Sequence, residues 1–162
     1  MRPPVTLLAA SLALAITTLP ADAQQQGNPP IIATPSSLSW SPAPAVLPAG
    51  AKLAVIEGDP TKAGAYTMRL KVPDGYRIPP HWHPGDEHVT VLQGTFRVGL
   101  GTPFDNTKLT DLPTGSFGML HPGMVHFAEA RGETVIQLHG MGPWSLTYAN
   151  PADDPRGGKA SR

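Results

Sequence analysis

The amino-acid sequence predicts an all-β fold, either a β-sandwich or a β-barrel, and three observations support this. Apolar and polar residues alternate with a period of two in several segments, which is the pattern of strands with one buried face. Turn-forming residues separate these segments, and the 162 residues include 20 Pro and 17 Gly, which leave little room for long helices. No segment after residue 23 has a helical period.

The strands can be placed individually. Segments that alternate clearly or are rich in β-branched residues predict strands at 66–72, 88–92, 95–100 and 134–138. Shorter strands are predicted at 52–57, 117–120, 125–129 and 145–148. Turn signals lie between them, at 58–60, 73–75, 93–94, 113–115, 122–123 and 131–132. Short strands at near-regular spacing are typical of sandwiches and barrels.

Both ends of the chain are predicted to lie outside the folded domain. Residues 1–23 combine a positive start, an apolar run from Val5 to Leu19 and the small-x-small pattern at 21–23, which predicts a secretory signal peptide. The alternative is a stray apolar terminus or an uncleaved anchor. Residues 24–36 read as a Pro- and Gln-rich linker, 37–150 as one folded domain and 151–162 as a flexible tail. We therefore expect an exported protein, periplasmic or secreted, with no membrane association after cleavage.

Composition narrows the partners and the chemistry. The chain has 12 Lys+Arg and 12 Asp+Glu, so its formal net charge is zero. This argues against nucleic acid as a partner, because binding to phosphate depends on clustered Lys and Arg. Cysteine is absent, which excludes thiol catalysis, thiolate metal sites and disulfides.

The six histidines all lie between residues 81 and 139, and the tightest group is the segment 81–83 (HWH) followed by Glu87. On an extended segment, residues two apart face the same side, so His81 and His83 can present imidazole nitrogens to one point. A Pro-Gly pair allows a turn that brings Glu87 back toward that point on the adjacent strand. Gly75 precedes the group, and Gly94 follows it where a further tight turn is expected. Two nitrogens and one carboxylate oxygen placed in this way suit a divalent metal ion.

This spacing resembles the first conserved motif of the cupin superfamily, position by position. Segment 115–126 is similar to the second cupin motif, with Gly115, Gly123 and His126 at matching positions. The resemblance implies a single jelly-roll barrel, or double-stranded β-helix, with a metal ion inside its mouth. It also implies that His126 is the fourth metal ligand, beside His81, His83 and Glu87. Cupins are commonly dimers through sheet contacts, so a homodimer is also expected.

Two positions depart from the second cupin motif, although neither is a ligand position. His121 stands where the family usually has Pro, and Ala130 where it usually has Asn. His121 precedes a Pro-Gly turn, so its side chain is expected either at the surface or beside the metal ligands.

Other polar and aromatic residues near the motifs have alternative interpretations. His88 has the opposite parity to Glu87 on its strand and is expected to face away from the metal, as is Trp82. Gln137 and His139 lie two apart on one predicted strand. If their face lines the barrel, they are candidate catalytic residues that hydrogen-bond a ligand or act as general base. The alternative is a polar pair on the outer face.

Three imidazoles and one carboxylate suit one divalent transition metal ion: Mn, Fe, Ni, Cu or Zn. An octahedral ion held by four protein atoms keeps two positions open, which favours catalysis over a purely structural role. The sequence therefore favours a metal-dependent oxygenase acting on a small organic molecule. The alternatives are an isomerase or lyase that uses the metal as a Lewis acid, and a non-enzymatic periplasmic ligand- or metal-binding protein.

Overall fold

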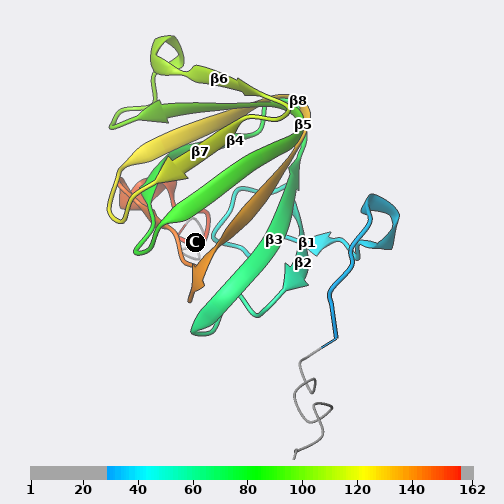
Figure 1. The fold of residues 1–162 in the computed structure, drawn as a ribbon. Coiled ribbons are helices and arrows are strands. Elements are labelled where there is room, and N and C mark those ends of the chain that lie inside the picture. Colours follow the sequence, from blue (N-terminus) through cyan, green and yellow to red (C-terminus); the bar gives the residue numbers. More distant parts are fainter. Residues whose placement is uncertain (1–28, 158–162) are drawn as a thin grey trace, which may run out of the picture. The chain divides into compact units, whose positions relative to one another are not determined.

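A computed structural model describes residues 29–157, and this part of the chain is mostly β-structure. Nine antiparallel strands form a continuous hydrogen-bonded sheet that curls back on itself (Figure 1). The strands are β1 (Ser41–Pro42), β2 (Lys52–Glu57), β3 (Gly64–Val72), β4 (Arg77–Trp82), β5 (Glu87–Leu100), β6 (Thr110–Pro113), β7 (Phe117–Leu120), β8 (His126–Gly142) and β9 (Thr147–Tyr148). Helical structure in these residues is limited to the short 3-10 helices η2 (Pro35–Ser37), η3 (Asn106–Lys108) and η4 (Pro151–Asp153). The predicted all-β jelly-roll fold is confirmed, whereas the predicted signal peptide lies outside the described residues.

The two longest strands, β5 and β8, organise the barrel. The N-terminal half of β5 pairs with the C-terminal half of β8, and this layer is extended by β3 and β2 on one side and by β7 on the other. The C-terminal half of β5 pairs with the N-terminal half of β8, and this layer is extended by β4 and β9 on one side and by β6 on the other. The apolar core therefore draws side chains from both halves of each long strand.

Each long strand spans two segments that the sequence predicts as separate strands. The turns predicted at 93–94 and 131–132 are wrong, because β5 and β8 continue through them. Gly94 and Gly132 have φ angles of +75° and +73°, and the β5–β8 register shifts between Gln93 and Thr95. A glycine with positive φ lets a strand bend without reversing. The turn signal is therefore real, but here it marks the passage from one layer to the other.

Strand β4 was not predicted as a strand, although its end was expected to be extended. Pro79 and Pro80 lie inside it and cannot donate backbone hydrogen bonds. They fall within an irregularity of the pairing with β8, between Ile78 and His81. The prolines are therefore accommodated where the ladder is interrupted, and the pairing resumes at His81.

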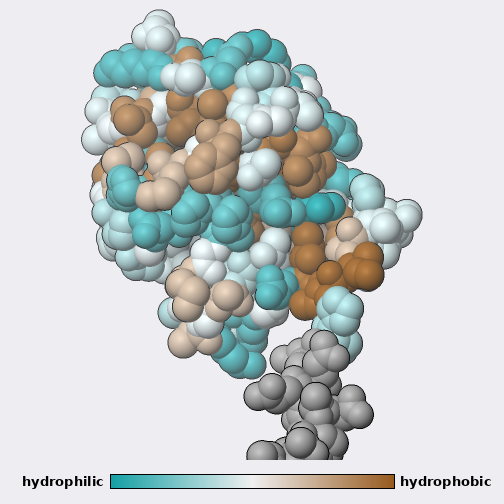
Figure 2. Space-filling view, in the orientation of Figure 1, coloured by the Kyte–Doolittle hydropathy of each residue, from teal (hydrophilic) through white to brown (hydrophobic). Residues whose placement is uncertain are grey.

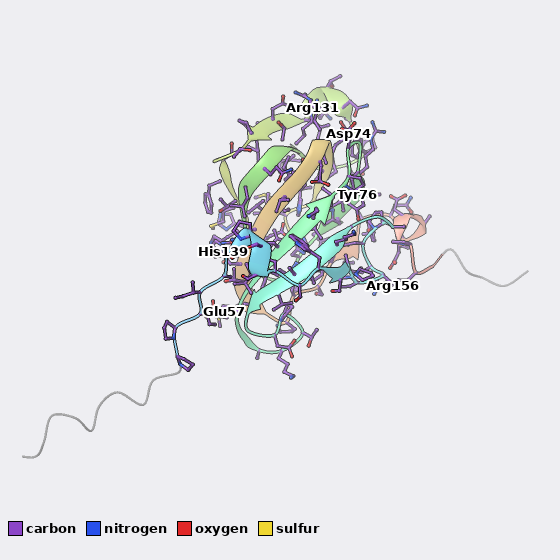
Figure 3. The ribbon with its side chains drawn as sticks, turned by 90° about the vertical axis from the view of Figure 1, so that its right-hand side faces the viewer. Glu57, Asp74, Tyr76, Arg131, His139 and Arg156 are labelled. Atoms are coloured by element: carbon purple, nitrogen blue, oxygen red, sulfur yellow. The ribbon has the colours of Figure 1, made fainter. Side chains whose placement is uncertain are left out.

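The predicted period-two burial is confirmed on β3, where Tyr66, Met68, Leu70 and Val72 are all buried. The segment that precedes β2 closes one side of this core. Tyr76 donates its hydroxyl hydrogen to the carbonyl of Pro48 (2.6 Å), and Tyr148 donates to the carbonyl of Val46 (2.7 Å); Figure 3 shows Tyr76. These bonds hold residues 46–48 against the barrel, where Leu47 is buried.

The surface is mixed. Figure 2 shows hydrophobic residues in separate patches among polar ones on the face drawn, and the exposed large hydrophobic side chains of the barrel include Leu100, Phe117 and Met119. Of the helices in the described part of the chain, none has the length and apolarity required to cross a bilayer.

Candidate metal centre

Four polar side chains of the first and second motifs are buried together inside the barrel. His81, His83, Glu87 and His126 are between 3% and 7% exposed. His81 lies on β4 directly opposite His126, the first residue of β8. His83 follows the end of β4, and Glu87 begins β5. The two segments that carry these residues, 81–87 and 126, are therefore joined by strand pairing.

The three imidazoles converge. One nitrogen from each of His81, His83 and His126 lies within 4.8 Å of the others. The ring centres of His81 and His126 are 4.2 Å apart, and that of His83 is 5.1 Å from His81 and 5.3 Å from His126. This is the convergence that the spacing predicts for His81 and His83 and that the cupin resemblance implies for His126.

Backbone carbonyls fix which nitrogen of each ring faces the others. The Nδ1 atoms of His81, His83 and His126 lie 2.7, 2.7 and 3.0 Å from the carbonyl oxygens of Pro79, Ser145 and Met124. A carbonyl oxygen only accepts, so each Nδ1 carries the hydrogen and donates it. In a neutral ring, Nε2 then presents its lone pair. This hydrogen bond at the outer nitrogen is the arrangement that orients metal-binding histidines in proteins.

The Glu87 carboxylate faces two of these Nε2 atoms. Its oxygens lie 3.4 Å from Nε2 of His83 and 3.6 Å from Nε2 of His126. The Nε2 of His83 is buried and has no hydrogen-bond partner in the described residues. Acceptors thus face acceptors in a buried site, which is unfavourable unless a positive charge lies between them. The donor set fits a divalent metal ion, because such an ion would satisfy all four groups together.

Burial controls the protonation of these groups. Desolvation, together with charge repulsion from the neighbouring His126 and His83, lowers the pKa of His81 to about 3. Desolvation also lowers the pKa of His83. Burial on its own raises the pKa of Glu87, but the adjacent His126 and His83 outweigh it, so the pKa lies below its usual range. His81 and His83 are therefore neutral, and Glu87 is ionised, at neutral pH, which are the forms that bind metal.

The cavity beside these residues is narrow and otherwise apolar. The volume open to the centre of a water molecule is about 20 Å³, which suffices for about one water. Apart from the four polar side chains, its lining is apolar or aromatic and includes Leu70, Ile78, Val89, Phe96, Leu120 and Trp144. No other titratable side chain of residues 29–157 lines it.

The structure does not bring Gln137 and His139 to this cavity. Their neighbours Ile136 and Leu138 line it, so Gln137 and His139 face the other side of β8. Gln137 accepts a hydrogen bond from Arg69 (3.1 Å), and the ring of His139 stacks on that of His88, with centres 4.8 Å apart. Of the two alternatives for this pair, the geometry corresponds to the polar pair on the outer face.

Three further residues lie where their strand parity or turn context indicated. His88 pairs across the sheet with His139 and shares its face, away from the cavity. Trp82 is half-buried and lines no part of the cavity. His121 is exposed and lies 3.2 Å from Asp86 (Nδ1 to Oδ1), so it is the surface alternative that the structure shows.

Two aromatic residues beside the centre were not singled out from the sequence. The ring of Trp144 lies 5.8 Å from that of His83, and its Nε1 is buried without a partner in the described residues. Tyr66 lies behind Glu87, and burial together with the Glu87 charge raises the pKa of its hydroxyl to about 12. Tyr66 is part of an ordinary alternating strand and Trp144 lies in a Gly-Pro-rich connection, so neither carries a local signal of function.

The curled double layer, with three histidines and a glutamate buried at its centre, defines the protein as a member of the cupin superfamily. The chain belongs to the family described as the ChrR cupin-like domain, whose model matches residues 28–145. No functionally curated protein shows significant sequence similarity to it.

Solved structures with the same fold are distant in sequence. The polyketide cyclase RemF from Streptomyces resistomycificus matches with a TM-score of 0.63 and 13% identity, over 76% of this chain and 88% of its own. A proposed acetylacetone dioxygenase from Methylibium petroleiphilum matches with a TM-score of 0.61 and 17% identity, over 81% of this chain and 88% of its own. An RmlC-like cupin from Shewanella frigidimarina matches with a TM-score of 0.53 and 13% identity, over 67% of this chain and 87% of its own. These similarities concern the fold.

Proposed function

We propose that the protein is a metal-dependent oxygenase that acts on a small organic molecule. The observation that carries the proposal is the donor set: three Nε2 lone pairs and one carboxylate face one another inside an apolar cavity. His81, His83, Glu87 and His126 would hold the ion. A redox-active divalent metal would supply open positions at which molecular oxygen and the substrate meet. The chain's own contribution is to orient the ligands through backbone carbonyls and to limit water around them.

The lining of the cavity favours an oxygenase over an isomerase or lyase. Proton abstraction requires a general base that is free of the metal and within hydrogen-bond reach of the substrate. The titratable groups among the described residues that line the cavity are the four proposed ligands. The two residues considered as a base, Gln137 and His139, face the other side of β8. An oxygenase can act without such a base, because a redox-active metal and molecular oxygen would supply the reactivity.

The narrowness of the cavity favours one alternative, a non-enzymatic metal-binding protein. A cavity of about 20 Å³ has room for about one water and for no organic molecule. For the enzyme, the substrate must therefore bind beside the cavity or displace part of its wall. The two proposals share the metal centre and differ only in turnover.

The metal centre is tested by metal analysis of protein recovered from its own compartment. We expect His81→Ala and His126→Ala to lose most of the bound metal while circular dichroism still shows a folded β-protein. His121→Ala is the matched control, because this histidine is exposed and outside the cavity. Metal contents of His81→Ala and His126→Ala equal to that of the control would refute the ligand assignment.

Turnover is tested by oxygen uptake of the Fe-, Mn- and Cu-loaded protein. Acetylacetone is the first substrate to test, because a proposed acetylacetone dioxygenase shares the fold; small aromatics and keto acids follow. Uptake that requires both metal and substrate supports the oxygenase. Tight metal binding without uptake on any of them favours the metal-binding protein.

We also propose that the protein is exported to the periplasm or the medium, on the basis of the pattern in residues 1–23. Mass spectrometry of the natural protein should show that the chain begins at Gln24. A mature protein that retains Met1–Ala23 would contradict this.

A further inference from the structure

The metal cavity is closed to solvent, so a molecule reaches it only when part of its wall moves. The four proposed ligands are between 3% and 7% exposed, and the cavity beside them has room for about one water. A metal ion, and still more an organic molecule, needs a wider path. Which part of the wall moves depends on what holds each part in place.

Strand pairing fixes most of this wall. The lining residues of β3, β4, β5 and β8 belong to the antiparallel ladder, so moving one of them breaks several backbone hydrogen bonds together. Leu120 ends β7 and lies directly opposite Glu87 in the ladder, so it cannot move without a proposed ligand. Apart from the proposed ligands, the remaining lining residues are Leu47, Trp144 and Leu146, which lie outside the strands.

The segment that carries Trp144 and Leu146 is itself tied to a proposed ligand. The carbonyl of Ser145, between them, accepts the hydrogen bond from His83 Nδ1 (2.7 Å). The backbone N–H of Trp144 donates to the carbonyl of Pro60 (2.6 Å), which adds a second attachment. A movement of this segment would therefore disturb the orientation of the His83 imidazole.

The strap, as we call residues 43–51 between β1 and β2, contributes the third of these side chains. Leu47 is 5% exposed and lines the metal cavity. The backbone hydrogen bonds of the strap run within it, from the N–H of Ala43 to the carbonyl of Ala51 (3.0 Å) and from the N–H of Leu47 to that of Pro44 (2.9 Å). The strap is therefore not part of the ladder of the barrel.

Two tyrosine hydroxyls attach the strap to the barrel. Tyr76 donates to the carbonyl of Pro48 (2.6 Å), and Tyr148 donates to that of Val46 (2.7 Å). The Nδ1 atoms of the three histidines donate to carbonyls of other segments, so within the described part of the chain no proposed ligand depends on a strap carbonyl. A movement of the strap therefore breaks two side-chain hydrogen bonds and the contacts of Leu47, while the histidines keep their orientation.

A larger cavity borders the strap as well. It has a volume of about 320 Å³, and Pro44, Ala45 and Val46 line it, whereas the next residue, Leu47, lines the metal cavity. Its lining is mostly apolar. A volume of about 300 Å³ is the lower end of the range for small-molecule sites. The strap is therefore part of the wall between a cavity that is too small for an organic molecule and one that can hold it.

We propose that the strap is the gate of the metal cavity: when its two tyrosine hydrogen bonds break and Leu47 withdraws, the metal ion and a small, mostly apolar substrate enter from the larger cavity. This inference rests on the proposed function, because it supplies the entry route to the same metal centre. It explains how a buried centre with room for about one water can be loaded with metal and act on an organic molecule.

The first test uses the absence of cysteine from the chain. Leu47→Cys places one thiol in the cavity wall. Its rate of reaction with methyl methanethiosulfonate, followed by mass spectrometry, reports how often the strap opens in the metal-free protein. Tyr76→Phe removes one of the two hydrogen bonds that hold the strap, and Tyr148→Phe removes the other. Circular dichroism checks that each variant is folded, and either tyrosine variant suffices for the test.

Thr134→Val is the matched control. Thr134 is buried, and its hydroxyl donates to the carbonyl of Gly132 (3.1 Å), outside both the strap and the lining of the metal cavity. We expect Tyr76→Phe to speed the reaction of the Leu47→Cys thiol by about two- to tenfold, the effect of one hydrogen bond, and Thr134→Val to leave it unchanged. No acceleration by Tyr76→Phe, or equal acceleration by both variants, would overturn the proposal; in the second case the thiol reacts through unfolding of the whole domain.

The second test follows the metal ion itself. Uptake of Zn²⁺, and its release into excess EDTA, are measured by stopped flow with a zinc-sensitive dye in the wild type, Tyr76→Phe and Thr134→Val. A gate changes both rates and leaves the equilibrium unchanged. Tyr76→Phe should therefore speed uptake and release by the same factor, about two- to tenfold, and keep the wild-type Kd. Faster release alone, with weaker binding, would mean that the hydroxyl supports the ligands, and would overturn the gate.

The two tests keep the gate and the metal centre distinguishable. A thiol that responds to Tyr76→Phe in a protein that takes up no Zn²⁺ would support the gate while the metal centre fails. Normal Zn²⁺ affinity, with no effect of Tyr76→Phe on thiol reactivity or on the exchange rates, would refute the gate alone.

Discussion

The bend at Gly94 gives a quantitative test of how the two layers of the barrel are joined. Gly94 and Gly132 have nearly the same φ, +75° and +73°, but different surroundings. A Cβ at Gly94 would lie 2.5 Å from the carbonyl oxygen of Glu133 and 2.6 Å from Oγ1 of Thr134, whereas a Cβ at Gly132 would have no atom within 4 Å. The two Gly→Ala substitutions therefore share the backbone cost and differ only in the steric cost.

The magnitudes follow from this difference. A left-handed conformation costs a residue with a Cβ about 1–2 kcal/mol, and the reduced freedom of the unfolded chain offsets about 0.4–1 kcal/mol of that cost. We expect Gly132→Ala to lower the free energy of unfolding by about 1 kcal/mol. Gly94→Ala adds an overpacking cost of about 1–3 kcal/mol, because the backbone of β8 must move. Its total is about 2–4 kcal/mol.

The assay is urea unfolding of the protein, followed by circular dichroism, with thermal melts alongside. For a domain of this size each kcal/mol corresponds to about 3–4 °C in Tm. Gly94→Ala should therefore melt well below Gly132→Ala. Equal destabilisation by the two substitutions would refute the reasoning, because it would mean that the close approach of β5 and β8 at this bend contributes nothing.

Three further predictions concern the centre and the surface. In the metal-free protein the pKa of His81 is lowered to about 3, so the unfolded state takes up the proton first as pH falls below about 6.5. The free energy of unfolding should therefore drop by about 2 kcal/mol between pH 7 and pH 5, measured by urea unfolding. The drop should be smaller in His81→Asn. A pH-independent midpoint would contradict this. His139→Ala and Gln137→Ala should keep wild-type metal content, because both side chains face away from the cavity. A loss of metal in either variant, measured by mass spectrometry, would contradict this placement. Arg97 contacts Asp111 (2.9 Å) and Glu129 (2.6 Å), so Arg97→Gln should lower the urea midpoint at low salt and lower it less in 1 M NaCl. A loss of the same size at both salt concentrations would argue against an ionic origin.

The sequence predicts the strands well and their connections less well. Alternation identifies β3, in which every second residue from Tyr66 to Val72 is buried, and the limits of β2 and β7 agree with the predicted ones. The fusion of two predicted strands into β5, and of two into β8, depends on the partner strand that continues beside each bend. A Gly-containing dipeptide is the same local signal whether the chain reverses or bends, so only tertiary pairing separates the two.

The candidate site also combines features that have a local sequence signal with features that depend on tertiary pairing. His81, His83 and Glu87 are close in the chain; strand parity aligns the two histidines, and the Pro-Gly turn brings Glu87 back to them on the next strand. His126 comes from a distant segment, and its position opposite His81 depends on the β4–β8 register. The direction of Gln137 and His139 depends on which face of β8 is covered by the other layer. Trp144 is invisible in the sequence because its significance lies in an unsatisfied N–H, which exists only in the folded chain.

The short segment before β9 supports one proposed metal ligand from two sides. The carbonyl of Ser145 accepts the hydrogen bond from His83 Nδ1 and thereby fixes which nitrogen of that ring faces Glu87. The ring of the adjacent Trp144 lies 5.8 Å from the same imidazole. The corresponding Nδ1 atoms of His81 and His126 donate to Pro79 and Met124, which lie outside this segment. Substitutions that move the backbone of this segment should therefore disturb the orientation of His83 before that of the other two imidazoles.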